Sequence, residues 1–179
     1  MAEHTHSDPD ITERTLVDRA RGGDLDALES LFRRHRAEVY RVAFHLTASP
    51  DDADDVVQDV FIGLPEAMRG LANSASLGPW LRRVAARSAL MRMRGEQRRR
   101  QSALEDVGAT RAAADRGIDR MAISDAIAGL PPELRAVFVL KEIEGYSHAE
   151  IASLLAISVA NSEVRLHRAR RKLRARLGG

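Results

Sequence analysis

Cysteine is absent from this chain of 179 residues, and its absence excludes several kinds of chemistry at once. No disulfide, thiolate metal site or thiol nucleophile can form, and nothing requires an oxidising compartment. Long apolar runs are missing too, because no stretch approaches the roughly 18 residues that a membrane span needs. The polar, acidic N-terminus does not resemble a signal peptide. These absences predict a cytoplasmic protein that makes no membrane contact of its own.

The alternation of apolar and polar residues that marks a half-buried strand does not occur over a useful length, so we expect no sheet. Apolar residues instead recur at spacings of three and four from Ala27 to Leu46, which predicts a core helix. A content of 44% hydrophobic residues is enough to build real cores. The sequence therefore predicts an all-α fold.

Two further helices are predicted before residue 101. In SPDDADDVVQDVFIGL, Ser49 can cap a helix that has Pro50 in its first turn, and Pro65 should end or kink it. A third helix can open at Pro79 and bury a stripe of apolar residues at helical spacing. Residues 101–119 contain few large apolar side chains, and we interpret them as a flexible linker.

The C-terminal part has the pattern of a helix-turn-helix. The Pro-Pro pair at 131–132 can start a helix, and Gly145 can stop one. Ser147 and Glu150 form the S-x-x-E pattern of a capping box. We expect that capped helix to run to about Leu155, with a longer helix beginning three or four residues later.

The longer helix is strongly basic. Residues 158–174, SVANSEVRLHRARRKLR, carry six Lys or Arg side chains and a histidine against one acid, Glu163. The second helix of a helix-turn-helix lies in the major groove of DNA, where an Arg side chain can grip a phosphate or a guanine edge at two points. A basic amphipathic helix can also be a solvated face or lie on a membrane, but neither role needs the capped helix before it.

Charge is segregated in the first half as well. No Lys or Arg occurs between Arg41 and Arg69, and an acidic face in this position repels DNA and suits a basic protein surface, unless it serves only the helix dipole and solubility. Residues 82–100 reverse the sign, with eight Arg against one Glu, and three of them share a face that could follow a phosphate backbone. The carboxylates of the first segment are Asp51, Asp52, Asp54, Asp55, Asp59 and Glu66.

Neither an enzyme nor a cofactor is expected. The aspartates are not accompanied by a histidine at ligand spacing, an H-E-x-x-H motif, an EF-hand glycine or a glycine-rich phosphate loop. No nucleophile has a partner base. His4 and His6 lie in a polar tail near Asp8 and Asp10, and the other histidines are scattered over separate helices. We therefore expect no metal site.

The charge blocks, in this order and at this spacing, resemble the extracytoplasmic-function (ECF) group of bacterial RNA polymerase sigma factors. The D-A-(D/E)-D-x-V-Q-(D/E)-x-F pattern of that family's region 2 is present from Asp52 to Phe61, and Trp80 and Leu81 occupy the W-L position. LPPELRAVFVLKEIEGYSHAEIASLLAIS followed by RLHRARRKLR resembles region 4. The resemblance covers most of the chain. It implies an alternative sigma factor, which binds core RNA polymerase, directs initiation at a subset of promoters and is commonly controlled by an anti-sigma factor.

The resemblance also implies the residues at each site. Core RNA polymerase would bind the acidic helix at Asp52, Asp55, Gln58 and Asp59. The loop from about residue 71 to 78 and the helix behind it would open and read the -10 element of promoter DNA. The contacts to that element would be Asn73, Ser74, Ser76, Trp80, Arg83, Arg87 and Arg94. The -35 element would be read by Ser147, Glu163, Arg165, His167, Arg168, Arg171 and Lys172.

Departures from the family pattern fall where specificity is decided. The usual G-T-V-K-S-R-L at the start of the recognition helix is here ANSEVRL, so Glu163 replaces a base-reading cation and Ser162 replaces an apolar packing residue. A carboxylate can accept a hydrogen bond from cytosine, which predicts a different -35 sequence. In region 2 the Asn and Asp of A-R-N-x-x-x-D are absent after Arg87, and Pro65 replaces a common Trp.

The predicted organisation is two small helical domains joined by a flexible linker. Residues 1–22 are a tail and the start of the first helix, 23–100 the region 2 bundle, 101–119 the linker and 120–179 the region 4 helix-turn-helix. Two other interpretations stay open. A stand-alone helix-turn-helix regulator would bind palindromic DNA as a dimer but leaves the acidic helix unexplained. A sigma-like adaptor would bind polymerase or an anti-sigma factor but no promoter.

Overall fold

The computed structural model describes residues 12–70, 76–102 and 118–177, and within these ranges the chain is helical and has no strand. The prediction of an all-α fold is confirmed. Most of the predicted linker, residues 103–117, lies outside the described residues. The helices are α1 (Glu13–Arg21), α2 (Leu25–Thr47), α3 (Pro50–Arg69), α4 (Leu77–Ser102), α5 (Ile118–Ala128), α6 (Pro132–Phe138), the π-helix η1 (Val139–Ile143), α7 (His148–Leu155) and α8 (Val159–Leu177).

Local capping groups set where the first helices begin. The carboxylate of Asp24 accepts hydrogen bonds from the backbone N–H of Asp26 and Ala27 at 3.0 and 3.1 Å and so caps α2. Ser49 caps α3, as predicted, by accepting from the backbone N–H of Asp52 at 3.3 Å. Between these helices Ala48 adopts the left-handed conformation with φ 55°, which ends α2.

Pro65 does not end α3, which continues to Arg69. Proline removes one backbone hydrogen bond inside a helix and crowds the preceding turn. Leu64 and Met68, on either side of it, are buried at 1% and 0% exposure, and this burial holds the final turn in helical form. Helix α4 begins at Leu77, two residues before the predicted start at Pro79, so the proline still lies in the first turn, where its missing N–H costs little.

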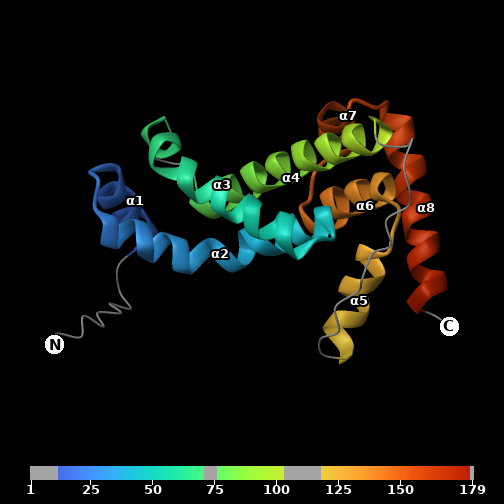
Figure 1. Ribbon diagram of the computed structural model, residues 1–179, viewed down its shortest axis with the longest axis horizontal. Coiled ribbons are helices and arrows are strands. Elements are labelled where there is room, and N and C mark those ends of the chain that lie inside the picture. Colours follow the sequence, from blue (N-terminus) through green and yellow to red (C-terminus); the bar gives the residue numbers. More distant parts are fainter. Residues whose placement is uncertain (1–11, 71–75, 103–117, 178–179) are drawn as a thin grey trace.

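The first half of the chain is a bundle around α2. Helices α1, α3 and α4 all pack on α2, and α3 also packs on α4 (Figure 1). Their shared core includes Leu31, Val42, Val56 and Leu81, each at 1% exposure or less. Burying a side chain of this size contributes about 1.5–3 kcal/mol, so the apolar stripes seen in the sequence account for this packing.

The second half contains the predicted helix-turn-helix. Glu150 accepts from the backbone N–H of Ser147 at 2.8 Å, and Ser147 accepts from the backbone N–H of Glu150 at 3.2 Å, which completes the capping box. Gly145, with φ 74°, follows the π-helix, and α7 ends at Leu155, as expected. Helix α5 was not predicted, because it lies between the proposed linker and the Pro-Pro pair and carries only a short apolar stripe.

The two halves pack against each other, chiefly through α2, α5, α6 and η1 (Figure 1). Arg135 of α6 is 1% exposed at this junction. Its guanidinium donates to the carbonyls of Leu46 and Thr47 at 2.9 and 3.1 Å, and to those of Ala128 and Leu130 at 2.8 and 3.3 Å. Carbonyls at a helix end have no partner within the helix. Arg135 therefore joins the end of α2 to the second half.

Candidate protein and nucleic-acid interfaces

The aspartates predicted to bind polymerase lie together on the outer side of α3. Asp55 and Asp59 are 54% and 56% exposed, Gln58 is exposed between them, and Asp52 is half-buried near the helix start. Ile62 is 70% exposed one turn beyond Gln58 and Asp59. A face that combines charged groups with an exposed apolar side chain suits a protein partner.

Arg92 of α4 lies over this acidic face, a relationship that the sequence did not reveal. Its guanidinium donates to Asp55 at 2.9 Å and to Asp59 at 3.1 Å, and lies 4.0 Å from Asp52. Partial desolvation lowers the pKa of Arg92, but the hydrogen bonds and charges of Asp59 and Asp55 outweigh it, so the pKa is raised overall. The acids are therefore held in place by a cation of the same chain.

The residues predicted to read the -10 element are spread along α4 and the segment before it. Trp80 is half-buried and packs against the core, whereas Ser76, Arg83 and Arg87 are exposed. Asn73 and Ser74 lie outside the described residues. The first turns of α4 therefore present two arginines to solvent and anchor the only tryptophan beneath them.

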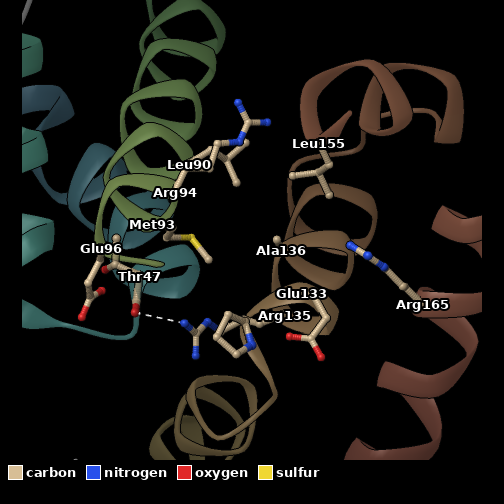
Figure 2. A pocket seen from close by; sticks show the side chains of 11 residues that line it. Thr47, Leu90, Met93, Arg94, Glu96, Glu133, Arg135, Ala136, Leu155 and Arg165 are labelled. Atoms are coloured by element: carbon tan, nitrogen blue, oxygen red, sulfur yellow. Dashed lines mark hydrogen bonds between the residues drawn. The ribbon is translucent and has the colours of Figure 1, made fainter. Parts of the chain in front are cut away.

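Arg94, further along α4, has a different environment. It donates to the carbonyl of Leu154 at the end of α7, so it connects the two halves. It also lines a cleft of about 290 Å³ between the end of α4 and helices α6 to α8, which Figure 2 shows from close by. In this conformation Arg94 is engaged with the second half.

The residues predicted to read the -35 element lie mainly on the outer face of α8. Leu166, Ala169 and Leu173 form its buried stripe. Arg165 is half-buried, donates to the side-chain oxygen of Asn161 at 3.1 Å and points into the cleft (Figure 2). Glu163, His167, Arg168, Arg171 and Lys172 are exposed.

Helix α7, the first helix of the helix-turn-helix, contributes fewer polar side chains that are available for contact with DNA. The hydroxyl of Ser147 donates to Glu150 at 2.7 Å and is thus occupied by the capping box. The hydrogen bonds that Glu150 accepts from the backbone N–H and from the hydroxyl of Ser147 hold the pKa of its carboxyl below the usual value. On α8, Arg170 pairs with Glu142 of η1 at 2.7 Å. The exposed face of α8 therefore provides most of the candidate DNA contacts.

A buried carboxylate lies where the two halves meet. The side chain of Glu144 is 5% exposed and lies 3.8 Å from Arg82 of α4, which in turn binds Glu38 of α2 at 2.9 Å. Desolvation raises the pKa of Glu144, and the lowering effect of Arg82 does not cancel it. The junction therefore includes a group that accepts a proton more readily than an ordinary glutamate.

The described part of the chain contains neither a metal-binding cluster nor a membrane-spanning helix. No group of three His, Asp or Glu side chains there is arranged to hold a metal ion. No helix in the same ranges has the length and hydropathy that crossing a bilayer requires.

Sequence comparison identifies two matching family models and several curated relatives. A model of sigma-70 region 2 matches residues 31–99, and one of sigma-70 region 4 matches residues 120–173. The ECF RNA polymerase sigma factor SigM of Mycobacterium tuberculosis is 31% identical over 175 residues, which span 98% of this chain and 87% of the relative. The RNA polymerase sigma factor CarQ of Myxococcus xanthus is 31% identical over 166 residues, with 90% and 95% coverage.

Solved structures with a similar fold include two protein complexes. CnrH in complex with the cytosolic domain of CnrY is 30% identical, with a TM-score of 0.53 over 93% of this chain and 97% of that one. RpoE in complex with the anti-sigma factor NepR from Bartonella quintana is 20% identical, with a TM-score of 0.59 over 84% and 96%. The RpoE likeness concerns the fold alone.

Proposed function

The chain belongs to the ECF group of bacterial RNA polymerase sigma factors, and we propose that its acidic and basic faces divide the work of initiation between core polymerase and promoter DNA. It is an alternative sigma factor, which binds core RNA polymerase and directs transcription initiation at a subset of genes. It acts in the cytoplasm and performs no catalytic chemistry of its own.

The observation that carries the proposal is the separation of charge on α3 from charge on α4 and α8. Asp55, Gln58 and Asp59 present an exposed acidic face that repels DNA and attracts a basic protein surface. Arg83 and Arg87 of α4 and the outer face of α8 have the opposite sign. A stand-alone DNA-binding regulator has no use for the acidic face. The presence of this face therefore favours a factor that binds polymerase.

Two DNA-binding roles follow from this division. Residues 23–100 form region 2, in which the first turns of α4 and the segment before them capture unstacked bases of the -10 element. Residues 120–179 form region 4, in which α8 enters the major groove at the -35 element. Residues 101–119 link the two. Binding energy for the single-stranded state drives melting, and Glu163 selects cytosine at its position.

An anti-sigma factor completes the proposal. The relative CnrH was solved in complex with the cytosolic domain of another protein, CnrY, and its 30% identity to this chain extends over most of both. A protein that covers the acidic face of α3 or the cleft between the halves blocks polymerase and DNA together. We therefore propose that the binding of an anti-sigma factor regulates this chain.

Run-off transcription over a pool of genomic fragments tests the proposal. Purified core polymerase is assayed with and without the chain, and with a double variant, Asp55→Arg with Asp59→Arg. A matched control reverses the charges of Asp26 and Asp125, two exposed aspartates that lie away from the acidic face. New discrete transcripts that the double variant loses and the control keeps would establish the sigma factor. Binding to core without any transcript would favour the adaptor instead.

A further inference from the structure

Helix α1 contacts both ends of the segment that connects α3 to α4. Arg21, at the C-terminal end of α1, donates from Nε to the carbonyl of Met68 in the last turn of α3 at 3.0 Å. Glu13, at the other end of α1, accepts from the backbone N–H of Leu77, the first residue of α4, at 3.2 Å. The first turns of α4 belong to the proposed reader of the -10 element.

Both contacts are made with backbone groups at helix ends, where the helix itself supplies few partners, although the carbonyl of Met68 also receives the capping N–H of Gly70. The carbonyl of Met68 belongs to the last turn of α3 and the N–H of Leu77 to the first turn of α4. Hydrogen bonds with a charged partner are stronger than neutral ones. Glu13 and Arg21 are eight residues apart, about 12 Å along a helix axis. One short helix thus sets the distance between the two helix ends.

The carboxylate of Glu13 is itself held from the other side by α2. Its second oxygen lies 3.2 Å from Nε2 of His35, within ion-pair distance although out of line for a hydrogen bond. The side chain of His35 is 7% exposed. The start of α4 also lies against this imidazole, because a Cβ at Gly78 would be in ordinary van der Waals contact with it at 3.5 Å. Glu13 is therefore fixed between α2 and α4.

The anchoring of α1 to the core does not depend on these polar contacts. Leu16 and Ala20, at 4% and 3% exposure, already bury the apolar side of α1 in the bundle. Glu13 and Arg21 lie at the two ends of the helix and reach different elements. Their placement indicates a role in positioning the start of α4 relative to the end of α3.

We propose that α1 is a clamp that sets the spacing between Met68 and Leu77 and so positions the -10 reader for the capture of unstacked bases, with Glu13 and Arg21 as positioning residues. This inference rests on the proposed function. Base capture requires the reader to be held in a productive geometry before the bases arrive, because ordering it afterwards costs binding free energy. The clamp therefore acts on promoter opening and leaves polymerase binding and -35 binding unchanged.

The test uses holoenzyme formed with the full chain, on promoters that the wild-type holoenzyme already opens. Closed-complex affinity and the rate of open-complex formation are measured separately for Glu13→Ala and Arg21→Ala. The matched control is Arg19→Ala, which removes an arginine on the same helix whose partner is Asp24. We expect each clamp variant to slow opening about tenfold, with closed-complex affinity and core binding unchanged and the control behaving as wild type. Because only functional promoters are used, a negative result leaves the proposed function standing.

Two further measurements separate positioning from general loss of structure. Glu13→Gln keeps an oxygen that can accept from Leu77, so it should open promoters faster than Glu13→Ala. Trp80 is the only tryptophan, and its fluorescence reports on the first turn of α4 when a single-stranded oligonucleotide with the -10 sequence of the opened promoters is added. We expect weaker quenching at equal oligonucleotide concentration in the alanine variants. Opening rates that do not change in the alanine variants would overturn the clamp. So would parallel losses of promoter opening, core binding and thermal stability, because they would indicate a general loss of structure.

Discussion

Nδ1 of His148 lies 2.8 Å from the hydroxyl oxygen of Ser162, and this hydrogen bond joins the first residue of α7 to the first turn of α8. Ser162 is fully buried, at the position where the family usually has an apolar residue. A buried hydroxyl without a partner costs free energy, and the imidazole removes that cost. The departure therefore does not loosen the helix-turn-helix, because a polar contact replaces the apolar one.

Removing this hydroxyl should weaken the helix-turn-helix. We expect Ser162→Ala to lower the free energy of unfolding by about 1 kcal/mol, the net value of one hydrogen bond, and to reduce affinity for a -35 duplex, because α8 is no longer fixed against α7. Urea denaturation and duplex titration measure the two effects. Ser153→Ala on the exposed side of α7 is the control, and equal losses in both variants would show that the hydrogen bond has no special role.

Glu163 is exposed on α8, and reversing its charge should change which -35 sequence is preferred. Lysine at this position can donate to guanine, whereas glutamate accepts from cytosine, and discrimination at one base pair is worth about 1–3 kcal/mol. Selection of -35 duplexes by Glu163→Lys and wild-type chains measures the preference. Asp125→Lys makes the same change of net charge on α5, so a shift in preference shared by both variants would contradict base reading by Glu163.

Local signals in the sequence predicted most helix ends correctly. Ser49 and the capping box of Ser147 and Glu150 act within three residues, so their effect can be predicted from spacing alone. Pro65 does not end its helix as its sequence position suggested, because the burial of Leu64 and Met68 outweighs the missing hydrogen bond. That burial depends on the rest of the bundle. Propensity is a weak guide wherever tertiary packing opposes it.

The contacts that give the sites their character were beyond sequence reasoning. Arg92 meets Asp55 and Asp59 across 37 and 33 residues, and Arg135 meets the end of α2 across 88 and 89. Spacing along one helix predicts which side chains share a face, but not which side chain from another helix lies over them. The residue types at the sites were therefore predictable, whereas their partners were not.

Exchanging the charges of Asp59 and Arg92 should separate stability from polymerase binding. Asp59→Arg places two guanidinium groups together and lowers stability slightly, by less than about 1 kcal/mol for an exposed pair, while also weakening core binding. Adding Arg92→Asp restores an attractive pair within the chain but leaves the wrong charge for a basic partner. Because the carboxylate introduced at position 92 also faces Asp55 and Asp52, we expect the double variant to recover only part of its free energy of unfolding and none of its affinity for core polymerase. Recovery of both would place the polymerase contact elsewhere.

Glu144 should make the folded chain less stable as the pH rises. Because its pKa is raised in the folded state, that state binds the proton more tightly than the unfolded chain does. Its contribution is fully present below the ordinary glutamate pKa and is lost as the pH rises through the raised folded value. Glu144→Gln should remove this part of the pH dependence. Urea denaturation of both chains across that window measures it, and parallel curves would contradict a role for Glu144.

Arg135 should hold the two halves in a conformation that cannot bind a whole promoter. A promoter that engages both halves presents its -10 and -35 elements as two separate sites along the DNA, whereas Arg94 of α4 contacts Leu154 of α7 directly. The halves must therefore separate, and the buried guanidinium opposes this. Without it, the carbonyls of Leu46 and Thr47 need water, and each unpaired buried group costs about 1–3 kcal/mol. We expect Arg135→Ala to shift the free chain toward the separated form.

The absence of cysteine makes this separation straightforward to measure. Ser30→Cys on α2 and Ser153→Cys on α7 place one dye on each half at exposed positions. Energy transfer between the dyes should fall in Arg135→Ala. Arg135→Lys should have an intermediate effect, since an ammonium group keeps the charge but cannot reach carbonyls on both sides as the planar guanidinium does. Unchanged transfer in both variants would mean that apolar packing alone keeps the halves together. A fall in transfer on promoter binding but not in the free variant would show that DNA, not loss of Arg135, drives the separation.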